Sequence, residues 1–600
     1  MGKGAYIFRA CLVGATLVFS LLRVKAENLI RNGPIQSREY VVAVERDVTT
    51  RMRDGTLLRS DVYRPVNQGR FPVLLKRTPY NKLDGDGVFT PEFASKAAGK
   101  GYVVIIQDCR GRFHSEGEWY PLKFESTDGY DTIEWAATLP YGNGRIGMFG
   151  DSYFAVTATL AALAHPPHLA AVFVVFPASD YNDGFAYQGG AFLQELMEGW
   201  TSGVALNTLD RRVQKDMPIS RWEMDLALGE YPVLAPQGSF GPGLAPYFFD
   251  WVSHPNYDDY WKQWSADLHA DAVNVPIYQV AVWYDLFLGG TLKHYAAFKA
   301  HGGEVARGKQ WLMAGPWNHG PLTGKPGDID FGPASRGNME TLATRWFDYI
   351  LKNVDDGIGG EKPVKIFVMG ANVWRDENEW PLTGSRVSRF YLHSRGKATS
   401  LTGDGMLSAT PPERESPDHF VYDPGDPVPT MGSATGARDQ RPVEARSDVL
   451  VYTTTPFQKA MEVTEPISAE IYASSSAVDT DFTAKLVDIW PNGYAQNLTD
   501  GIIRARYRNS FEKPEFMNPG QIYKFLIDLW ATSNVFLPGH RLRLEISSSN
   551  FPRFNRNLNT GEDLLRATRM MKATDVIYHD RDHTSALILP IIGGSPRKSP

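Results

Sequence analysis

The chain has 600 residues, more than one ordinary domain needs, and its 43% hydrophobic and 22% charged content is typical of a globular protein that buries more than one core. Its net charge of −6 at pH 7, with no run of lysines or arginines, argues against a nucleic-acid partner. The sequence also lacks the Cys and His spacings of a metal site and a glycine-rich phosphate loop, so we expect no cofactor.

The first 26 residues have the pattern of a secretory signal peptide. Lys3 and Arg9 precede the apolar run from Ala10 to Leu22, and Ala26 supplies a small residue at the expected cleavage site. An uncleaved anchor is the alternative, although the run is shorter than the ~20 apolar residues that a membrane-spanning helix needs. We therefore expect cleavage near Ala26, export to the periplasm or the medium, and no stable membrane span afterwards.

Strands and helices alternate from residue 38 to about 181, after a leading β region, which predicts a mainly parallel sheet covered by helices. Within it, Arg145 to Ala158 (RIGMFGDSYFAVTA) reads as an apolar strand, a glycine, a serine and a helix of small residues. That order is typical of a nucleophile elbow, in which a sharp strand-to-helix turn raises a serine above the sheet. Ser152 would be that serine, with Gly150 before it; the alternative is a serine that only caps a helix.

The segment 182–273 has no strand pattern. Several of its apolar residues recur at helical spacing: Phe192, Leu193, Leu196, Met197 and Trp200. Because the segment is inserted between two strands of the predicted sheet, we expect a helical cap over Ser152 that excludes water and forms the acyl pocket. The alternative is that these aromatic residues only form the core of the cap itself.

Residues 274–355 return to alternating strands and helices. The strand Ile277 to Trp283 is followed closely by Asp285, and the strand Gln310 to Ala314 leads to His319. Serine, aspartate and histidine thus follow one another in the chain order of an α/β-hydrolase. Only His319 follows the last predicted strand, whereas four other histidines lie in or beside predicted helices: His165, His168, His294 and His301.

From residue 364 to 595 the chain consists of short runs with period-two alternation, separated by Pro, Gly, Asn and Asp. This pattern predicts an all-β sandwich, which we expect to be a jelly roll. The segment Pro411 to Arg441 is rich in Pro, Gly and Asp, so we expect it to be a long loop lying on the catalytic domain.

Motifs along nearly all of this length resemble the X-Pro dipeptidyl-peptidase and cocaine esterase (CocE/NonD) family of serine hydrolases. The matching stretches include RTPYNK (77–82), QDCRGRFHSEGEW (107–119), GMFGDSYF (147–154), WYDLF (283–287), GPWNHG (315–320) and LPGHRLRLEISSSNFPRFNRNLNTG (537–561). The resemblance implies an α/β-hydrolase domain over 38–181 and 274–355, a cap over 182–273 and a C-terminal jelly-roll domain over 364–595 that helps to wall the site.

Acyl-transfer chemistry assigns a role to each predicted site residue. Ser152 is the nucleophile, His319 accepts and later returns its proton, and Asp285 orients the imidazole and stabilises the imidazolium. The backbone N–H of Tyr153 is one donor for the oxyanion. The resemblance implies that the phenol O–H of Tyr80 is the second.

The sequence departs from the family pattern in two places. Ala155 stands where the elbow usually has its last glycine, and Val282 stands where a glycine commonly precedes the tryptophan of the acid motif. Neither change removes a reacting group, but both raise the question of whether the floor of the site is reshaped.

Three functions remain open at this stage. The first is hydrolysis of an ester or amide of a small acyl group, as in an esterase or acylase. The second is release of Xaa-Pro dipeptides, which needs carboxylates to hold the ammonium of a short peptide; candidates near the cap entrance are Asp180, Asp183, Glu195 and Glu198. The third is a catalytically weak binding protein on the same scaffold, and assembly into a homo-oligomer is open for all three.

Overall fold

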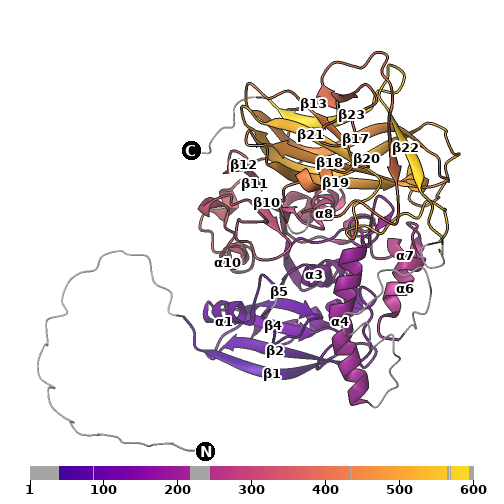
Figure 1. Cartoon of the computed structure of the whole chain (residues 1–600). Coiled ribbons are helices and arrows are strands. Elements are labelled where there is room, and N and C mark those ends of the chain that lie inside the picture. The colour runs from indigo at the N-terminus through magenta and orange to yellow at the C-terminus, as the bar shows by residue number, and fades with distance from the viewer. Residues whose placement is uncertain are drawn as a thin grey trace, which may run out of the picture. The chain divides into compact units, whose positions relative to one another are not determined.

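The structure is a computed structural model, and it describes residues 39–85, 87–215, 243–432, 436–563, 567 and 569–593 (Figure 1). The described residues from Tyr40 onward form one compact unit, and every element described here lies in it. The predicted signal peptide, residues 1–26, lies outside the described residues, as do residues 216–242 of the predicted cap. Within the described ranges, no helix has the length and apolar content needed to cross a membrane.

A ten-stranded sheet, with the order β1-β2-β4-β3-β5-β6-β9-β10-β11-β12, forms the centre of the catalytic domain. Its strands are β1 (Val42–Arg51), β2 (Leu57–Pro65), β3 (Phe71–Thr78), β4 (Val103–Asp108), β5 (Gly142–Asp151), β6 (Leu169–Val175), β9 (Ile277–Tyr284), β10 (Gln310–Asn318), β11 (Val364–Val368) and β12 (Val373–Glu377). The strands from β4 to β11 in this order run parallel, and the sheet ends in antiparallel pairs on both sides. Burial on both faces explains why β4 and β9 are mostly apolar rather than alternating, since every residue of both strands is buried.

Helices cover both faces of this sheet: α1 (Pro91–Gly99), α2 (Glu125–Ala137), α3 (Tyr153–Leu163), α8 (Leu288–His301), α9 (Glu304–Gly308) and α10 (Met339–Lys352). Phe149 of β5 packs in one cluster with Phe347 of α10 and Phe93 of α1. The preceding residue, Met148, packs in another cluster with Ala158 of α3. Because successive side chains of a strand point to opposite faces, α1 and α10 lie on one face and α3 on the other.

A cap is inserted between β6 and β9. It contains the short hairpin β7 (Tyr187–Gln188) and β8 (Ala191–Phe192), then α4 (Gln194–Gln214), α6 (Pro246–Ser253), α7 (Asp259–Lys262) and the 3₁₀ turn η1 (Ala270–Ala272). Within the described part of this segment, the sequence pattern missed these two short strands. Met197 and Val204 of α4 pack in one cluster with Tyr247 and Trp251 of α6, so the aromatic residues hold the cap together as well as facing the site.

The C-terminal domain is an all-β sandwich of jelly-roll type, drawn in orange and yellow in Figure 1. Its strands are β13 (Ser385–His393), β14 (Met406–Ser408), β15 (Asp418–Tyr422), β16 (Leu450–Thr453), β17 (Met461–Ser475), β18 (Asp481–Ile489), β19 (Ala495–Arg504), β20 (Tyr523–Phe536), β21 (Arg541–Ser547), β22 (Ala573–Tyr578) and β23 (Ala586–Ile592). Inward-facing residues of these strands form one large apolar cluster, which includes Phe482, Leu486 and Phe525.

The structure corrects two details of the sequence interpretation. β11 and β12 lie within the range predicted for the sandwich, which begins at residue 364, but they continue the catalytic sheet through parallel pairing of β11 with β10. The first strand of the sandwich is therefore β13. The segment 411–441 is not wholly a loop, because β15 lies within it and pairs with β22. These strands are only five residues long, and their pairing partners are decided by tertiary contacts rather than by local pattern.

The sandwich packs against the catalytic domain close to Asp285. Gln496 of β19 donates a hydrogen bond of 2.9 Å to the hydroxyl of Tyr284, the last residue of β9. Gly289 of α8 lies against Trp530 of β20, and a Cβ at Gly289 would be 2.4 Å from the indole nitrogen. The C-terminal domain therefore contacts both the end of β9, directly before Asp285, and the helix α8 that follows it.

Candidate active site

Ser152 occupies a strained turn between β5 and α3. Its φ of 53° and ψ of −125° are rare for a residue with a side chain, and its hydroxyl makes no capping hydrogen bond to α3. The residue at position 150 must be glycine, since a Cβ there would be 2.4 Å from the Cβ of Phe154 in the first turn of the helix. Close packing of strand against helix thus produces the turn, and Ser152 is presented to the cavity instead of serving as a helix cap.

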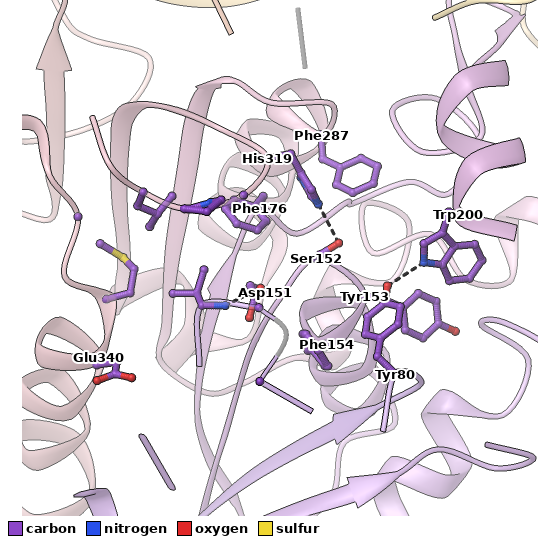
Figure 2. Close-up of a pocket in the computed structure, with 18 of the residues that line it drawn as sticks. Tyr80, Asp151, Ser152, Tyr153, Phe154, Phe176, Trp200, Phe287, His319 and Glu340 are labelled. Atoms are coloured by element: carbon purple, nitrogen blue, oxygen red, sulfur yellow. Dashed lines mark hydrogen bonds between the residues drawn. The ribbon is translucent and has the colours of Figure 1, made fainter. Parts of the chain in front are cut away.

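His319 lies beside this serine (Figure 2), and Asp285 lies beside His319, although the three residues come from distant parts of the chain. The His319 Nε2 atom is 3.0 Å from Ser152 Oγ, and His319 Nδ1 is 2.8 Å from Asp285 Oδ2. Asp285 follows β9 directly, and its other oxygen accepts the backbone N–H of Phe287 at 2.6 Å. This geometry fits an imidazole that donates from Nδ1 to the carboxylate and accepts the serine hydroxyl at Nε2.

The surroundings of His319 favour its protonated form. Burial against the rings of Phe176 and Phe287, whose centroids lie 4.7 and 5.3 Å from the imidazole, by itself lowers the pKa. The charge and hydrogen bond of Asp285, with a smaller contribution from the Asp151 carboxylate, outweigh that effect, so the pKa of His319 is raised. Its side chain keeps 22% of its surface exposed, on the cavity side.

The four competing histidines do not line this cavity in the described part of the chain. His294 is buried beneath the sheet, where its ring nitrogens contact Gln279 and Thr159 at 2.6 and 3.1 Å, and burial lowers its pKa to about 3. His168 contacts Glu134 at 2.7 Å on the surface. These contacts are structural, which leaves His319 as the histidine next to Ser152.

A cavity of about 990 Å³ lies over Ser152. The side formed by the cap and Phe287 is apolar and aromatic, lined by Phe185, Leu196, Met197, Trp200 and Phe287, and Phe154 and Phe176 add further apolar surface to the lining. The other side is formed by residues 320–322 and by residues 336–340 at the start of α10, where Glu340 lies (Figure 2). The site therefore has room for two unlike groups, one on each side of the serine.

Tyr80 and Tyr153 both reach this cavity. Tyr153 is the first residue of α3, and the N–H groups in the first turn of a helix have no acceptor within the helix. The Tyr80 hydroxyl accepts a hydrogen bond of 2.7 Å from the indole N–H of Trp200 in α4. Burial raises the pKa of Tyr80, so the phenol keeps its proton at neutral pH.

Comparisons with known proteins agree with this architecture. The family model of the X-Pro dipeptidyl-peptidase (S15 family) matches residues 54–321, and that of the X-Pro dipeptidyl-peptidase C-terminal non-catalytic domain matches residues 356–588. The cocaine esterase of Rhodococcus sp. (strain MB1 Bresler) is 38% identical over 576 residues, which cover 92% of this chain and 99% of the esterase. The chain belongs to the X-Pro dipeptidyl-peptidase and cocaine esterase family.

Solved structures extend the likeness to the whole fold. An aminopeptidase from a marine-sediment archaeon (Thaumarchaeota archaeon) superposes with a TM-score of 0.77 at 25% identity, covering 95% of this chain and 99% of its own. An α-amino acid ester hydrolase superposes with a TM-score of 0.74 at 23% identity over 94% of this chain and 100% of its own. As a member of the S15 and cocaine esterase family, the protein is a serine hydrolase, and this prediction from the sequence is confirmed.

The two departures from the family pattern lie outside the cavity wall. Ala155 and Val282 are fully buried, the first in the cluster between β5 and α3 and the second in the cluster on the opposite face of the sheet. Among the described residues that line the cavity, neither occurs. In this family member they change the packing beneath the site rather than its surface.

The carboxylates of the cavity are not those that we singled out as ammonium ligands. Asp180, Asp183, Glu195 and Glu198 are absent from the described lining, and Asp183 instead forms an ion pair of 2.7 Å with Lys293. Asp151 and Glu340 line the cavity. The sequence could have identified Asp151 as a residue of the site, because it precedes Ser152 directly. No sequence pattern around Glu340 predicts that this residue reaches the cavity.

Arg112 is a further residue that sequence reasoning missed. It belongs to the matched stretch 107–119, and its buried guanidinium donates to the carbonyl of Pro79 at 2.7 Å and to that of Val204 in α4 at 2.8 Å. It therefore joins the segment that carries Tyr80 to the cap.

Proposed function

We propose that the protein is an exported serine hydrolase that cleaves an ester or amide of a small acyl group through a Ser-His-Asp triad. His319 removes the proton of Ser152 as its oxygen attacks the acyl carbon, and Asp285 stabilises the resulting imidazolium. The oxyanion of the tetrahedral intermediate accepts hydrogen bonds from the N–H of Tyr153 and the O–H of Tyr80. His319 then gives its proton to the leaving group. In the second half of the reaction His319 accepts a proton from the water that attacks the acyl group, and it returns this proton to Ser152 as the acid is released.

The observation that carries this proposal is the chain of contacts from Ser152 through His319 to Asp285. A serine on a strained elbow, 3.0 Å from an imidazole that is 2.8 Å from a buried carboxylate, is the arrangement that activates a hydroxyl for acyl transfer. Its place in the floor of a large cavity argues against the alternative of a binding protein without catalysis.

The aromatic side of the cavity favours esterase or acylase activity over release of Xaa-Pro dipeptides. The curated relative that is 38% identical is a cocaine esterase. A dipeptidyl-peptidase needs carboxylates that face the substrate ammonium, and the four that we considered do not line the cavity in its described part. Export rests on the N-terminal sequence pattern alone.

Initial rates of the secreted form, residues 27–600, on a short-chain p-nitrophenyl ester and on Ala-Pro-p-nitroanilide test the proposal. We expect turnover of the ester, little release from the Ala-Pro substrate, and no turnover by Ser152→Ala or His319→Ala, both of which retain the fold. Efficient release from Ala-Pro-p-nitroanilide would make the protein a dipeptidyl-peptidase. Near wild-type turnover by either variant would contradict the triad.

A further inference from the structure

Trp200 of the cap contacts both Tyr80 and Tyr153, the residues predicted to supply the oxyanion donors. It lies in the second turn of α4, 120 residues from Tyr80 in sequence, and its indole N–H donates to the Tyr80 hydroxyl at 2.7 Å (Figure 2). The same indole stacks on the ring of Tyr153, with the ring centroids 5.4 Å apart and the planes inclined by 25°. One side chain of the cap thus contacts both residues that would supply oxyanion donors.

The hydrogen bond from Trp200 determines what the Tyr80 hydroxyl can do. A phenol oxygen that accepts from an indole N–H still has its own hydrogen to donate, and Tyr80 lines the cavity that holds Ser152. Accepting one hydrogen bond also polarises the O–H group, so the bond that it donates becomes stronger. Trp200 therefore both restricts the orientation of the phenol and makes it a better donor to negative oxygen.

The position of Trp200 depends in turn on how α4 is held. Arg112 links the helix to Pro79, the residue before Tyr80, through its bonds to the carbonyls of Pro79 and Val204. The neighbouring N–H of Phe113 donates to the Asn207 side chain of α4 at 3.1 Å. Burial lowers the pKa of Arg112 to about 10, which still leaves the guanidinium charged at neutral pH. The adjacent residues Arg112 and Phe113 therefore both bind α4, and Arg112 also binds the segment that carries Tyr80.

We propose that Trp200 is a positioning residue that orients and strengthens the Tyr80 O–H donor, so that the cap completes the oxyanion site instead of only covering it. This inference rests on the proposed function, because it assumes that Tyr80 stabilises an oxyanion formed at Ser152. It differs from a pocket-lining role for Trp200, which would act on substrate binding and would not depend on Tyr80.

A double-mutant cycle separates these roles. Trp200→Phe keeps an aromatic ring but removes the N–H, and we expect kcat for a p-nitrophenyl ester to fall about threefold to tenfold, with a smaller change in KM. Tyr80→Phe should lower kcat by about ten- to a thousandfold. In the Tyr80→Phe background, Trp200→Phe should cause no further loss of kcat beyond twofold, since the bond through which it acts is already gone.

A matched control is Trp261→Phe. Trp261 is also a buried tryptophan of the cap whose indole N–H donates to an oxygen, the carbonyl of His254 at 2.8 Å, but it does not line the described cavity. We expect its kcat to stay within twofold of the wild type. If Trp200→Phe does not fold, benzothienylalanine at position 200 retains the bicyclic shape without the N–H and serves in the same cycle.

Three results would overturn the inference. An equal loss of kcat from the Trp200 change in the wild-type and Tyr80→Phe backgrounds would show that Trp200 acts independently of Tyr80, and an unchanged kcat in Trp200→Phe would show that its N–H has no role. Unchanged kcat in Tyr80→Phe itself, alongside a complete loss in Ser152→Ala, would refute the inference while leaving the serine hydrolase function intact. Retained turnover in Ser152→Ala would instead refute the proposed function.

Discussion

At the scale of single residues, the site places two carboxylates around one imidazole. Asp285 makes the direct hydrogen bond, while Asp151, one residue before the proposed nucleophile, acts on His319 through its charge. One Asp151 oxygen accepts the N–H of Val88 at 3.0 Å, and the other has no hydrogen-bond partner among the described residues. Burial raises the pKa of Asp151, and the nearby charge of Lys76 opposes that rise.

Asp151→Asn is expected to move the acid limb of the pH profile of kcat/KM to lower pH. In the proposed mechanism catalysis requires neutral His319, so activity should be lost as the pH falls through the pKa of that residue. Asp151 contributes to raising this pKa, so removing its charge lowers the pKa and preserves activity in more acidic solution. The profile on a p-nitrophenyl ester measures the shift; an acid limb that does not move would mean that Asp151 is uncharged where His319 titrates.

Residues differ in how far the sequence reveals them. Ser152, Asp285 and His319 could be predicted because each follows a strand with a clear apolar pattern, and the carboxyl ends of parallel strands meet at one edge of the sheet. The bond from Trp200 to Tyr80 could not, because helical spacing identifies the apolar side of α4 without identifying the residue that it faces.

At the scale of elements, the β5–α3 turn is built by close packing. The first turn of α3 lies directly over Gly150, and the strained backbone of Ser152 follows from that contact. Periodicity could predict both elements because their patterns are local. It could not assign β11 to the catalytic sheet, since a five-residue apolar strand such as Val364–Val368 fits either sheet until its neighbour is known.

Gly150→Ala is expected to destabilise the protein by about 1–3 kcal/mol and to lower kcat strongly, because the new methyl group would push α3 away from β5 and displace Ser152. Denaturant unfolding and ester turnover measure the two effects. Gly203→Ala is the matched control: a Cβ at this position of α4 meets nothing within 4 Å, and we expect a gain of about 0.5–1 kcal/mol. Wild-type stability in Gly150→Ala would contradict the packing argument.

At the scale of the whole molecule, the sandwich supports the acid-bearing strand. The hydrogen bond from Gln496 to Tyr284 and the contact of Gly289 with Trp530 join the two domains near Asp285. The jelly roll could be predicted from its alternating strands, but its contact with β9 could not, since the residues involved are separated by more than 200 positions.

Gly289→Ala is expected to lower the free energy of unfolding by about 1–3 kcal/mol, because its Cβ would overlap the Trp530 indole and separate α8 from β20. Calorimetry of the full chain measures the loss as a lower transition temperature. Gly360→Ala, where a Cβ has no neighbour within 4 Å, serves as the control and should leave the transition unchanged. Equal transition temperatures for the two variants would mean that the Gly289 contact does not stabilise the molecule.

The central claim is that one serine, Ser152, carries the acyl group. Peptide mapping by mass spectrometry after reaction with an alkyl fluorophosphonate tests it most directly, since this reagent forms a covalent adduct with an activated serine. We expect one adduct per chain, on the peptide that contains Ser152, and a loss of esterase activity in proportion to the fraction of chains labelled. The variant His319→Ala should not be labelled. An adduct on a different serine, or esterase activity that persists when Ser152 is fully labelled, would contradict the claim.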